Sequence, residues 1–110
     1  MTRSDEERLA DIRSAIERCG SYRDFLSTPE LGPMAYDAVL RNLAVIGEAV
    51  RAVSDEFKAA HPEVTWPAIA GLRNIVVHEY FRVDPGLIRD ILDNHLAVLA
   101  SAVDGSSRSQ

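Results

Sequence analysis

The apolar positions along the chain follow the pattern of helices. Apolar side chains recur every three or four residues, which places them on one face of a helix. The clearest run spans residues 34–59, where steps of four and three alternate along Val39, Leu43, Ile46, Val50, Val53 and Phe57. No segment alternates steadily between apolar and polar residues, as a half-buried strand would. The pattern therefore predicts an all-α fold.

Capping and breaking residues divide this pattern into helices. Ser4 and the glutamate three residues later, Glu7, form a capping box that begins the first helix, and Gly20 ends it. The second helix covers 34–59 and ends before the His-Pro pair at 61–62, because proline does not continue a helix.

Two more helices follow on the same reasoning. Thr65 caps the third helix, in whose first turn Pro67 is tolerated. Asp84 is the N-cap of the fourth, and Pro85 takes its first position. The apolar stripe of the fourth helix consists of Ile88, Ile91, Leu92, His95, Leu99 and Val103. Four helices with short connections predict an antiparallel four-helix bundle, with room for an extra short helix.

Length, charge and cysteine content narrow the picture. The 110 residues suit one domain, which we place at 1–104, followed by a polar, Gly/Ser-rich tail at 105–110 that we expect to be disordered. A net charge of −5 argues against binding along a long duplex, so nucleic-acid contact is expected only at a local cleft. The single cysteine, Cys19, allows no internal disulfide, and the chain shows no signal peptide and no membrane span. A cytoplasmic protein is therefore expected.

The third helix has two distinct faces. At about 100° per residue, Ile69, Leu72, Ile75 and Val76 share one arc, which we assign to the core. The outer arc carries four polar side chains, interspersed with two large apolar ones: Arg73, Asn74, His78 and Tyr80, with Val77 and Phe81. Solvated surface is the ordinary explanation for such polar residues. The two apolar side chains instead favour a surface that faces a partner.

Arg73 and His78 lie about 140° apart on this helix, so a straight helix does not direct both at one point. Three arrangements would bring them together. The groove that they line is broad, the helix frays near His78, or a symmetric dimer presses two such faces together.

The stretch Arg73-Asn74-Ile75-Val76-Val77-His78, with Tyr80 two positions later, resembles the signature of the HEPN superfamily and of its HepT branch. The flanking segments are also similar to that branch, in order and at its spacing: Arg41-Asn42-Leu43, Ile46-Gly47-Glu48-Ala49, Trp66, Glu79-Tyr80-Phe81 and Val83-Asp84. The similarity extends from about Leu9 to Val103, nearly the whole chain. An Arg-x4-His pair alone would be weak evidence, whereas the ordered flanks make the resemblance specific.

The resemblance implies a metal-independent endoribonuclease toxin that acts on RNA as a homodimer, with paired motifs lining a cleft and no cofactor. It also implies a partner, a minimal nucleotidyltransferase antitoxin, which neutralises the toxin by adenylylating the motif tyrosine, here Tyr80. The candidate catalytic residues are then Arg73 and His78, with Asn74 and Tyr80 in support.

These residue types suit metal-free RNA cleavage, in which the 2′-OH attacks the adjacent phosphate. A histidine has a reference pKa of about 6.5, so His78 can act as base or acid near neutral pH. Arg73 can bind the phosphate bidentately and stabilise its growing charge. Asn74 can orient His78 or a phosphate oxygen. Tyr80 can hydrogen-bond to or stack on the substrate, and its hydroxyl can accept a nucleotide.

Other residues on the long second helix have open roles. Glu48 either pairs with an arginine or lines the dimer cleft, and the sequence favours neither. Arg41 and Asn42 are equally open, and we assign no catalytic role to any of the three.

The remaining histidines, tryptophan and cysteine are expected to be structural. His95 falls on the apolar stripe of the fourth helix and is expected to be packed and hydrogen-bonded, and His61 to end a helix. The histidines lack metal-ligand spacing, so no zinc site is expected. Trp66 is expected to fill the base of the bundle, and Cys19 to be a small buried residue.

Two alternatives belong to other functional classes. One is a non-catalytic helical adaptor or nucleotide-binding subunit of a nucleotidyltransferase complex. The other is a plain structural four-helix protein, in which Arg73 and His78 would be freely replaceable. The presence of both residues favours the enzyme.

Overall fold

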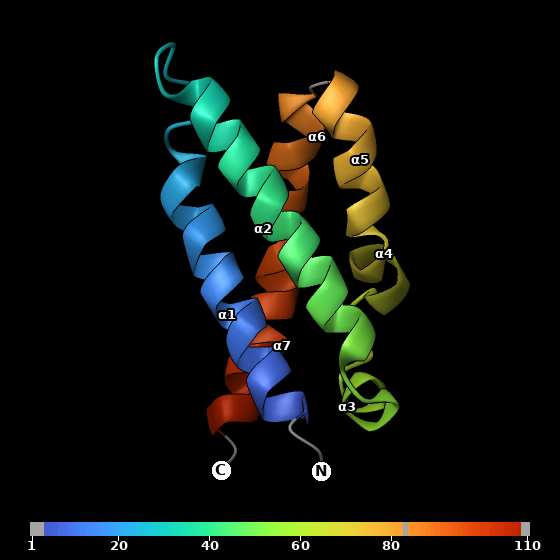
Figure 1. The fold of residues 1–110 in the computed structure, drawn as a ribbon. Helices are drawn as coiled ribbons and strands as arrows, with labels where there is room; N and C mark the ends of the chain where they lie inside the picture. Colours follow the sequence, from blue (N-terminus) through green and yellow to red (C-terminus); the bar gives the residue numbers. More distant parts are fainter. Residues whose placement is uncertain (1–3, 83, 109–110) are drawn as a thin grey trace.

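The fold is known from a computed structural model that describes residues 4–82 and 84–108, where every regular element is helical (Figure 1). In chain order the elements are α1 (Ser4–Arg23), α2 (Gly32–Ala52), α3 (Asp55–Ala60), α4 (Trp66–Ala70), α5 (Leu72–Arg82), α6 (Pro85–Asp90), the π-helix η1 (Ile91–His95) and α7 (Leu96–Arg108). The predicted all-α class is confirmed.

The helices form columns that run alternately up and down (Figure 1). α1 runs antiparallel to α2, α4 and α5 return beside α2, and α6, η1 and α7 form the last column. α2 is central, because it packs against α1 on one side and against α4 and α5 on the other. The short α3 forms part of the connection after α2. The predicted antiparallel four-helix bundle, with an extra short helix, is therefore confirmed.

The apolar stripes of all four columns meet in one core. Its largest fully buried side chains include Ile12, Leu43, Ile46, Ile69, Ile88 and Leu99. Burying each such side chain stabilises the fold by roughly 1.5–3 kcal/mol. Cys19 is buried among them, as predicted, and burial raises the pKa of its thiol to about 12.

The first helix does not end at Gly20, as predicted, but continues to Arg23. The extra turn is useful to the fold because Tyr22 packs against the core. Arg23 then makes a bidentate ion pair with Asp93 of η1, with both N···O distances at 2.7 Å. The predicted capping role of Ser4 involves a side chain outside the described part of the chain.

The predicted helix 34–59 is wrong in one respect, because it is broken after Ala52. Val53 is extended (φ −69°, ψ 144°), and Ser54 then caps α3 by accepting a hydrogen bond from the Phe57 amide at 3.1 Å. The carboxylate of Asp5 accepts from the amide of Ser54 at 3.0 Å and from its hydroxyl at 2.5 Å. Val53 at the break is buried, and Phe57 after it packs against the core. The apolar pattern therefore continues through the break.

The third column is also divided, with α4 and α5 on either side of Gly71. Thr65 occupies the predicted N-cap position of α4, but its side chain makes no capping hydrogen bond. Trp66 fills the predicted structural position. It is 9% exposed, and its Nε1 donates to the carbonyls of Lys58 and His61, both at 3.0 Å.

In the fourth column, Asp84 caps α6 as predicted by accepting from the amide of Leu87 at 3.2 Å. The π-turn η1 then shifts the helical register, because the Leu96 amide bonds to the carbonyl of Ile91, five residues earlier. Leu96 is therefore buried, whereas His95 is only half-buried; the expectation that His95 belongs to the core stripe was wrong to that extent.

α7 continues to Arg108, beyond the expected domain end at 104. The expected boundary therefore lies inside a helix, and residues 109–110 of the expected disordered tail lie outside the described part of the chain.

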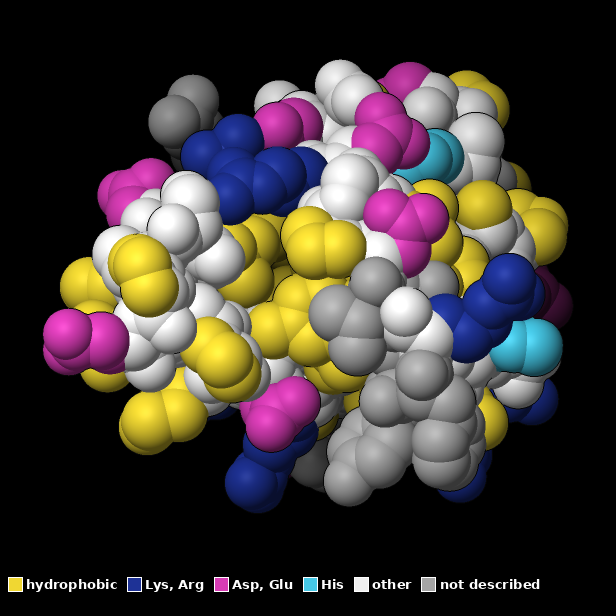
Figure 2. All heavy atoms as spheres, turned by 90° about the horizontal axis from the view of Figure 1, so that it is seen from above, with side chains coloured by type: hydrophobic (Ala, Val, Ile, Leu, Met, Phe, Trp, Pro, Cys, Tyr) yellow, Lys and Arg dark blue, Asp and Glu magenta, His cyan; other side chains and the backbone are white. Residues whose placement is uncertain are grey.

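The end of the bundle opposite the termini exposes apolar side chains. Figure 2 shows hydrophobic side chains gathered at this end, with charged groups around them. They include Phe25, Leu31, Met34 and Leu87, which are between 38% and 70% exposed. None of the helices in 4–82 and 84–108 is both long and apolar enough to cross a membrane.

Candidate functional site

A close contact between α2 and the start of α5 positions Arg73. Gly47 of α2 has no side chain, and a Cβ added there would lie 3.4 Å from both the amide nitrogen of Arg73 and the carbonyl oxygen of Ile69. The glycine thus allows the two backbones to approach each other. The next residue along α2 is Glu48, so the same contact brings a carboxylate beside Arg73.

Arg73 and Glu48 form an ion pair at 3.0 Å between Nη1 and Oε1. Of the two roles that the sequence leaves open for Glu48, pairing with an arginine is therefore observed. Both side chains are mostly solvent-exposed, at 60% and 55%. An exposed pair of this kind contributes at most about 1 kcal/mol to stability. The pair therefore fixes the direction of Arg73 more than it stabilises the fold.

The two faces predicted for the motif helix are present in α5. Leu72 is buried, and Ile75 and Val76 are half-buried and pack against the core. The polar residues of the motif whose side chains are described, Arg73, Asn74 and His78, are exposed. Val77, which lies between them on the helix, is 58% exposed. The backbone of Tyr80 is in the last turns of α5, but its side chain, like that of Phe81, lies outside the described part.

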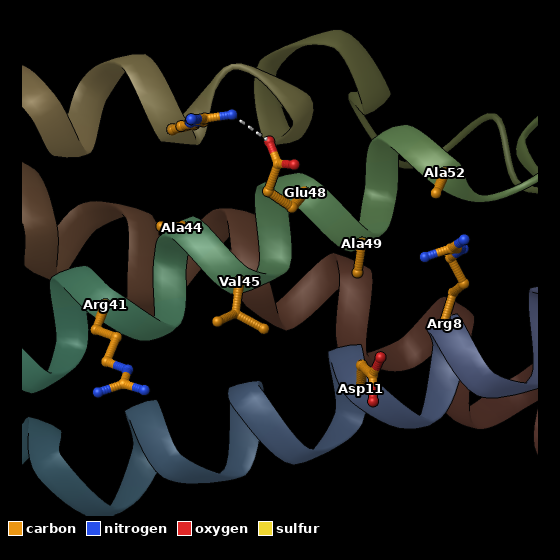
Figure 3. Close-up of a pocket in the computed structure, with 9 residues that line it drawn as sticks. Arg8, Asp11, Arg41, Ala44, Val45, Glu48, Ala49 and Ala52 are labelled. Atoms are coloured by element: carbon orange, nitrogen blue, oxygen red, sulfur yellow. Dashed lines mark hydrogen bonds and ion pairs between the residues drawn. The ribbon is translucent and has the colours of Figure 1, made fainter.

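A groove runs along α1 and α2 and reaches Arg73 (Figure 3). Its volume is about 640 Å³, and it is lined by Arg8, Asp11, Arg41, Ala44, Val45, Glu48, Ala49, Ala52 and Arg73. The structure thus brings Arg73 together with Glu48 and Arg41, but His78 is not among the lining residues. α5 is helical from Leu72 to Arg82, so it does not fray near His78, and helical geometry keeps Arg73 and His78 about 140° apart.

Comparison with known proteins identifies the family of this chain. The family model described as ribonuclease HepT-like matches residues 6–104. The protein named "Probable ribonuclease HepT" of Thermococcus cleftensis is 38% identical over 90 residues, covering 76% of this chain and 78% of that protein. The chain belongs to the HepT-like ribonuclease family.

A second family member is similar over more of the chain. This protein of Caldanaerobacter subterraneus subsp. tengcongensis, named "Putative RNase", is 35% identical over 100 residues, covering 89% of this chain and 86% of that protein. No solved structure matches the chain. The resemblance read from the motif and its flanks is therefore confirmed at the level of the HepT-like family.

Asn42 and His61 of this HepT-like chain make contacts within the fold. Asn42 is buried, and its side-chain Nδ2 donates a hydrogen bond to the carbonyl of Ala38, one turn earlier in α2, at 2.8 Å. His61 ends α3 as predicted, stacks at 4.4 Å on the ring of Phe57, and lies 3.3 Å from Glu63. Within the described ranges, no group of three or more His, Cys, Asp or Glu side chains is placed to hold a metal ion.

Sequence reasoning about this HepT-like chain did not place Arg8 and Asp11 near the motif. Both residues are on α1, more than sixty positions before Arg73, and both line the same groove. The sequence shows only that both residues lie off the apolar stripe of α1. Any solvated residue of that helix has the same property, so it does not identify residues near Arg73.

Proposed function

We propose that this chain is a metal-independent endoribonuclease in which Arg73 and His78 carry the reaction. The observation that supports it best is the motif itself: both side chains lie on the exposed face of α5, in a chain of the HepT-like ribonuclease family. Relatives named as ribonucleases support the same substrate class, RNA.

The proposed reaction uses the 2′-OH of the RNA as nucleophile. A base, His78 of one motif, removes its proton while the 2′-oxygen bonds to phosphorus and the bond to the 5′-oxygen breaks. An acid returns a proton to the leaving 5′-oxygen, so the products are a 2′,3′-cyclic phosphate and a 5′-hydroxyl. Arg73 binds the phosphate and stabilises the charge that builds on its oxygens. Asn74 orients His78 or a phosphate oxygen, and Tyr80 contacts the substrate.

The proposal includes a homodimer, in which two copies of α5 line one cleft. Two features of the single chain support this. Arg73 reaches the groove whereas His78 is not among its lining residues, so a partner copy is a simple way to complete the site. Val77, on the same helix between them, is 58% exposed, which favours a surface covered by a partner.

The proposal also includes regulation, in a toxin–antitoxin pair, by a nucleotidyltransferase antitoxin that adenylylates Tyr80. The tyrosine oxygen would attack the α-phosphorus of ATP and release pyrophosphate, leaving AMP on Tyr80. This anion would lie on the side of α5 that carries Arg73, two turns along, and would compete with RNA phosphate for that arginine. The exposed apolar side chains at the same end of the bundle as the last turn of α5 suit the approach of a partner protein (Figures 1 and 2).

The decisive experiment is cleavage of RNA by the purified chain with a chelator present. We expect the wild type to cleave and to leave cyclic phosphate ends, and Arg73→Ala and His78→Ala each to lose cleavage while unfolding at the wild-type temperature. Arg51→Ala, which changes an exposed arginine of α2 outside the groove, is the matched control. Full activity in either motif variant would contradict the assignment.

Coexpression with a nucleotidyltransferase of this class tests the regulation separately. Mass spectrometry should find one added adenylyl group on Tyr80, and none in Tyr80→Phe. A chain that binds the nucleotidyltransferase tightly but cleaves no RNA at stoichiometric concentration would instead be a non-catalytic adaptor.

A further inference from the structure

The groove between α1 and α2 is positively charged in a chain that is negative overall. The whole chain has a net charge of −5. The groove is lined by three arginines, Arg8, Arg41 and Arg73, and by two carboxylates, Asp11 and Glu48. Three positive charges less two negative ones leave a local charge of +1. The groove that the motif reaches through Arg73 therefore has a formal charge opposite in sign to that of the whole chain.

The three arginines are spread along the groove. Figure 3 shows Arg41 and Arg8 towards opposite ends, with Glu48 between them. Glu48 follows Arg41 by seven residues, or two turns, which is roughly 11 Å along α2. Because Glu48 pairs with Arg73, the order of positive groups along the groove is Arg41, Arg73, Arg8.

Two of these arginines are available to a ligand. Over the described parts of the chain, neither Arg8 nor Arg41 has an ion-pair partner, whereas Arg23 is held by both oxygens of Asp93. The floor between them consists of small apolar side chains, Ala44, Val45, Ala49 and Ala52. A floor of this kind offers few groups that read a base, but it lets a flexible strand lie close to the guanidinium groups.

We propose that this groove binds the phosphate backbone of single-stranded RNA, with Arg41 and Arg8 as phosphate ligands on either side of Arg73. The inference rests on the proposed function, since it assigns the path that the RNA takes to Arg73. Guanidinium groups bind phosphate oxygens with paired hydrogen bonds, and a local groove suits a chain whose total charge disfavours a long duplex.

In this arrangement Glu48 holds Arg73 in the groove until a phosphate replaces the carboxylate. A neighbouring groove of about 580 Å³ shares Arg41 and Val45 with the first, and its other lining residues are Arg18, Tyr22, Asp37, Ala38 and Asn42. The strand therefore continues along α1 and α2 past Arg41, towards Arg18.

The test is RNA binding by His78→Ala, which keeps the groove but removes the proposed base, so the probe is not cut. A fluorescein-labelled, unstructured 12-nucleotide RNA is titrated by anisotropy at several salt concentrations. In this background Arg8→Ala and Arg41→Ala should each raise Kd roughly three- to tenfold. Each should also reduce the slope of log K against log salt by about 0.7, the effect of one lost contact with single-stranded phosphate.

Two controls separate lost charge from lost fold. Arg41→Lys should keep most of the affinity and the full salt slope, because its charge remains. Arg51→Ala should bind as the parent does, because this arginine of the same helix does not line the groove. The thermal unfolding of every variant should match that of the parent.

Three results would overturn the proposal. The first is unchanged affinity and salt slope in both Arg8→Ala and Arg41→Ala while the wild type still cleaves RNA, which refutes the groove but keeps the proposed function. The second is a change of sedimentation mass in Arg41→Ala at constant salt slope, which would make this face an interface between two copies. The third is failure of the wild type to cleave or bind any RNA, which refutes the proposed function and the groove together.

Discussion

Two arginine–carboxylate pairs join distant parts of this chain, and they differ in almost every respect. Arg23 of α1 binds both oxygens of Asp93 in η1 at 2.7 Å. Arg73 of α5 binds one oxygen of Glu48 at 3.0 Å. The first pair joins residues 70 positions apart, with side chains 36% and 45% exposed, whereas the side chains of the second are 60% and 55% exposed.

The difference suggests that the first pair supports the fold, whereas the second leaves its arginine accessible. The hydrogen bonds from Arg23 hold the pKa of the Asp93 carboxyl below its usual range, and the same bonds raise the pKa of Arg23. This pair fastens α1 to the last column at the π-turn. The columns joined by Arg73 and Glu48 are already held together by the contact at Gly47. The second pair is more exposed and contributes little to the fold, and in the proposed function its arginine is the one that binds RNA phosphate.

The sharpest test compares alanine at the two arginines. Arg73→Ala should lower the rate of RNA cleavage at least about 100-fold, because it removes the group proposed to neutralise the phosphate. Arg23→Ala should cleave at the wild-type rate. The measurement is single-turnover cleavage with protein in excess, and equal loss of activity in both variants would refute the distinction.

Gly47→Val should show that the backbone contact, and not the ion pair, joins α2 to α5. The added side chain has to displace the backbone around Arg73, because even a Cβ would lie at 3.4 Å. We expect a loss of about 1–3 kcal/mol in the free energy of unfolding, measured in urea, together with a loss of cleavage. Gly20→Val is a useful control, because nothing lies within 4 Å of a Cβ at Gly20. Wild-type stability in Gly47→Val would contradict the close-contact interpretation.

Glu48→Gln should weaken the hold on Arg73 without removing its neighbour. We expect KM for RNA to fall about two- to fivefold, the range of an exposed ion pair, with kcat and the unfolding temperature unchanged. A fall in kcat with constant KM would show instead that Glu48 is needed to orient Arg73 during the reaction.

Asp93→Asn should have the smallest effect, on stability alone and with a defined pH dependence. Because the folded-state pKa of Asp93 is lowered, its pair contributes stability above the ordinary aspartate pKa of about 3.9, and this is lost as pH falls through the lowered value. The wild type should therefore unfold at a slightly higher temperature than Asp93→Asn near neutral pH, and the difference should vanish in acid. A difference that grows on acidification would contradict the sign of the shift.

The sequence predicted the helices and their buried faces, but not the two places where a helix is broken or changes register. The stripe of the second helix correctly placed Val53 in the core and Phe57 against it, but it did not reveal the break between them. The Asp5–Ser54 hydrogen bonds accompany that break while both apolar side chains stay inward. The π-turn is similar: one extra residue in the turn buries Leu96 and moves His95 towards the surface.

Of the candidate site, the sequence predicted the exposed face of α5 but not the residues that other helices bring to it. A helical wheel requires only local spacing, so the exposed face of α5 could be derived from the sequence. The partner of Arg73 lies 25 residues earlier, and Arg8 lies on another helix. Their positions depend on how α1, α2 and α5 pack, which spacing within one helix does not determine.

The burial of Cys19 has a practical consequence for testing the dimer. Cys19 as a whole is 1% exposed, and with a pKa of about 12 its thiol stays protonated at neutral pH. Thiol reagents react with exposed thiolates, so the natural chain is nearly inert towards them. A cysteine introduced at Val98, an exposed position on α7 rather than on the proposed α5 cleft, would then be the single reactive position. A pair of spin labels attached there would report the distance between two copies of the chain.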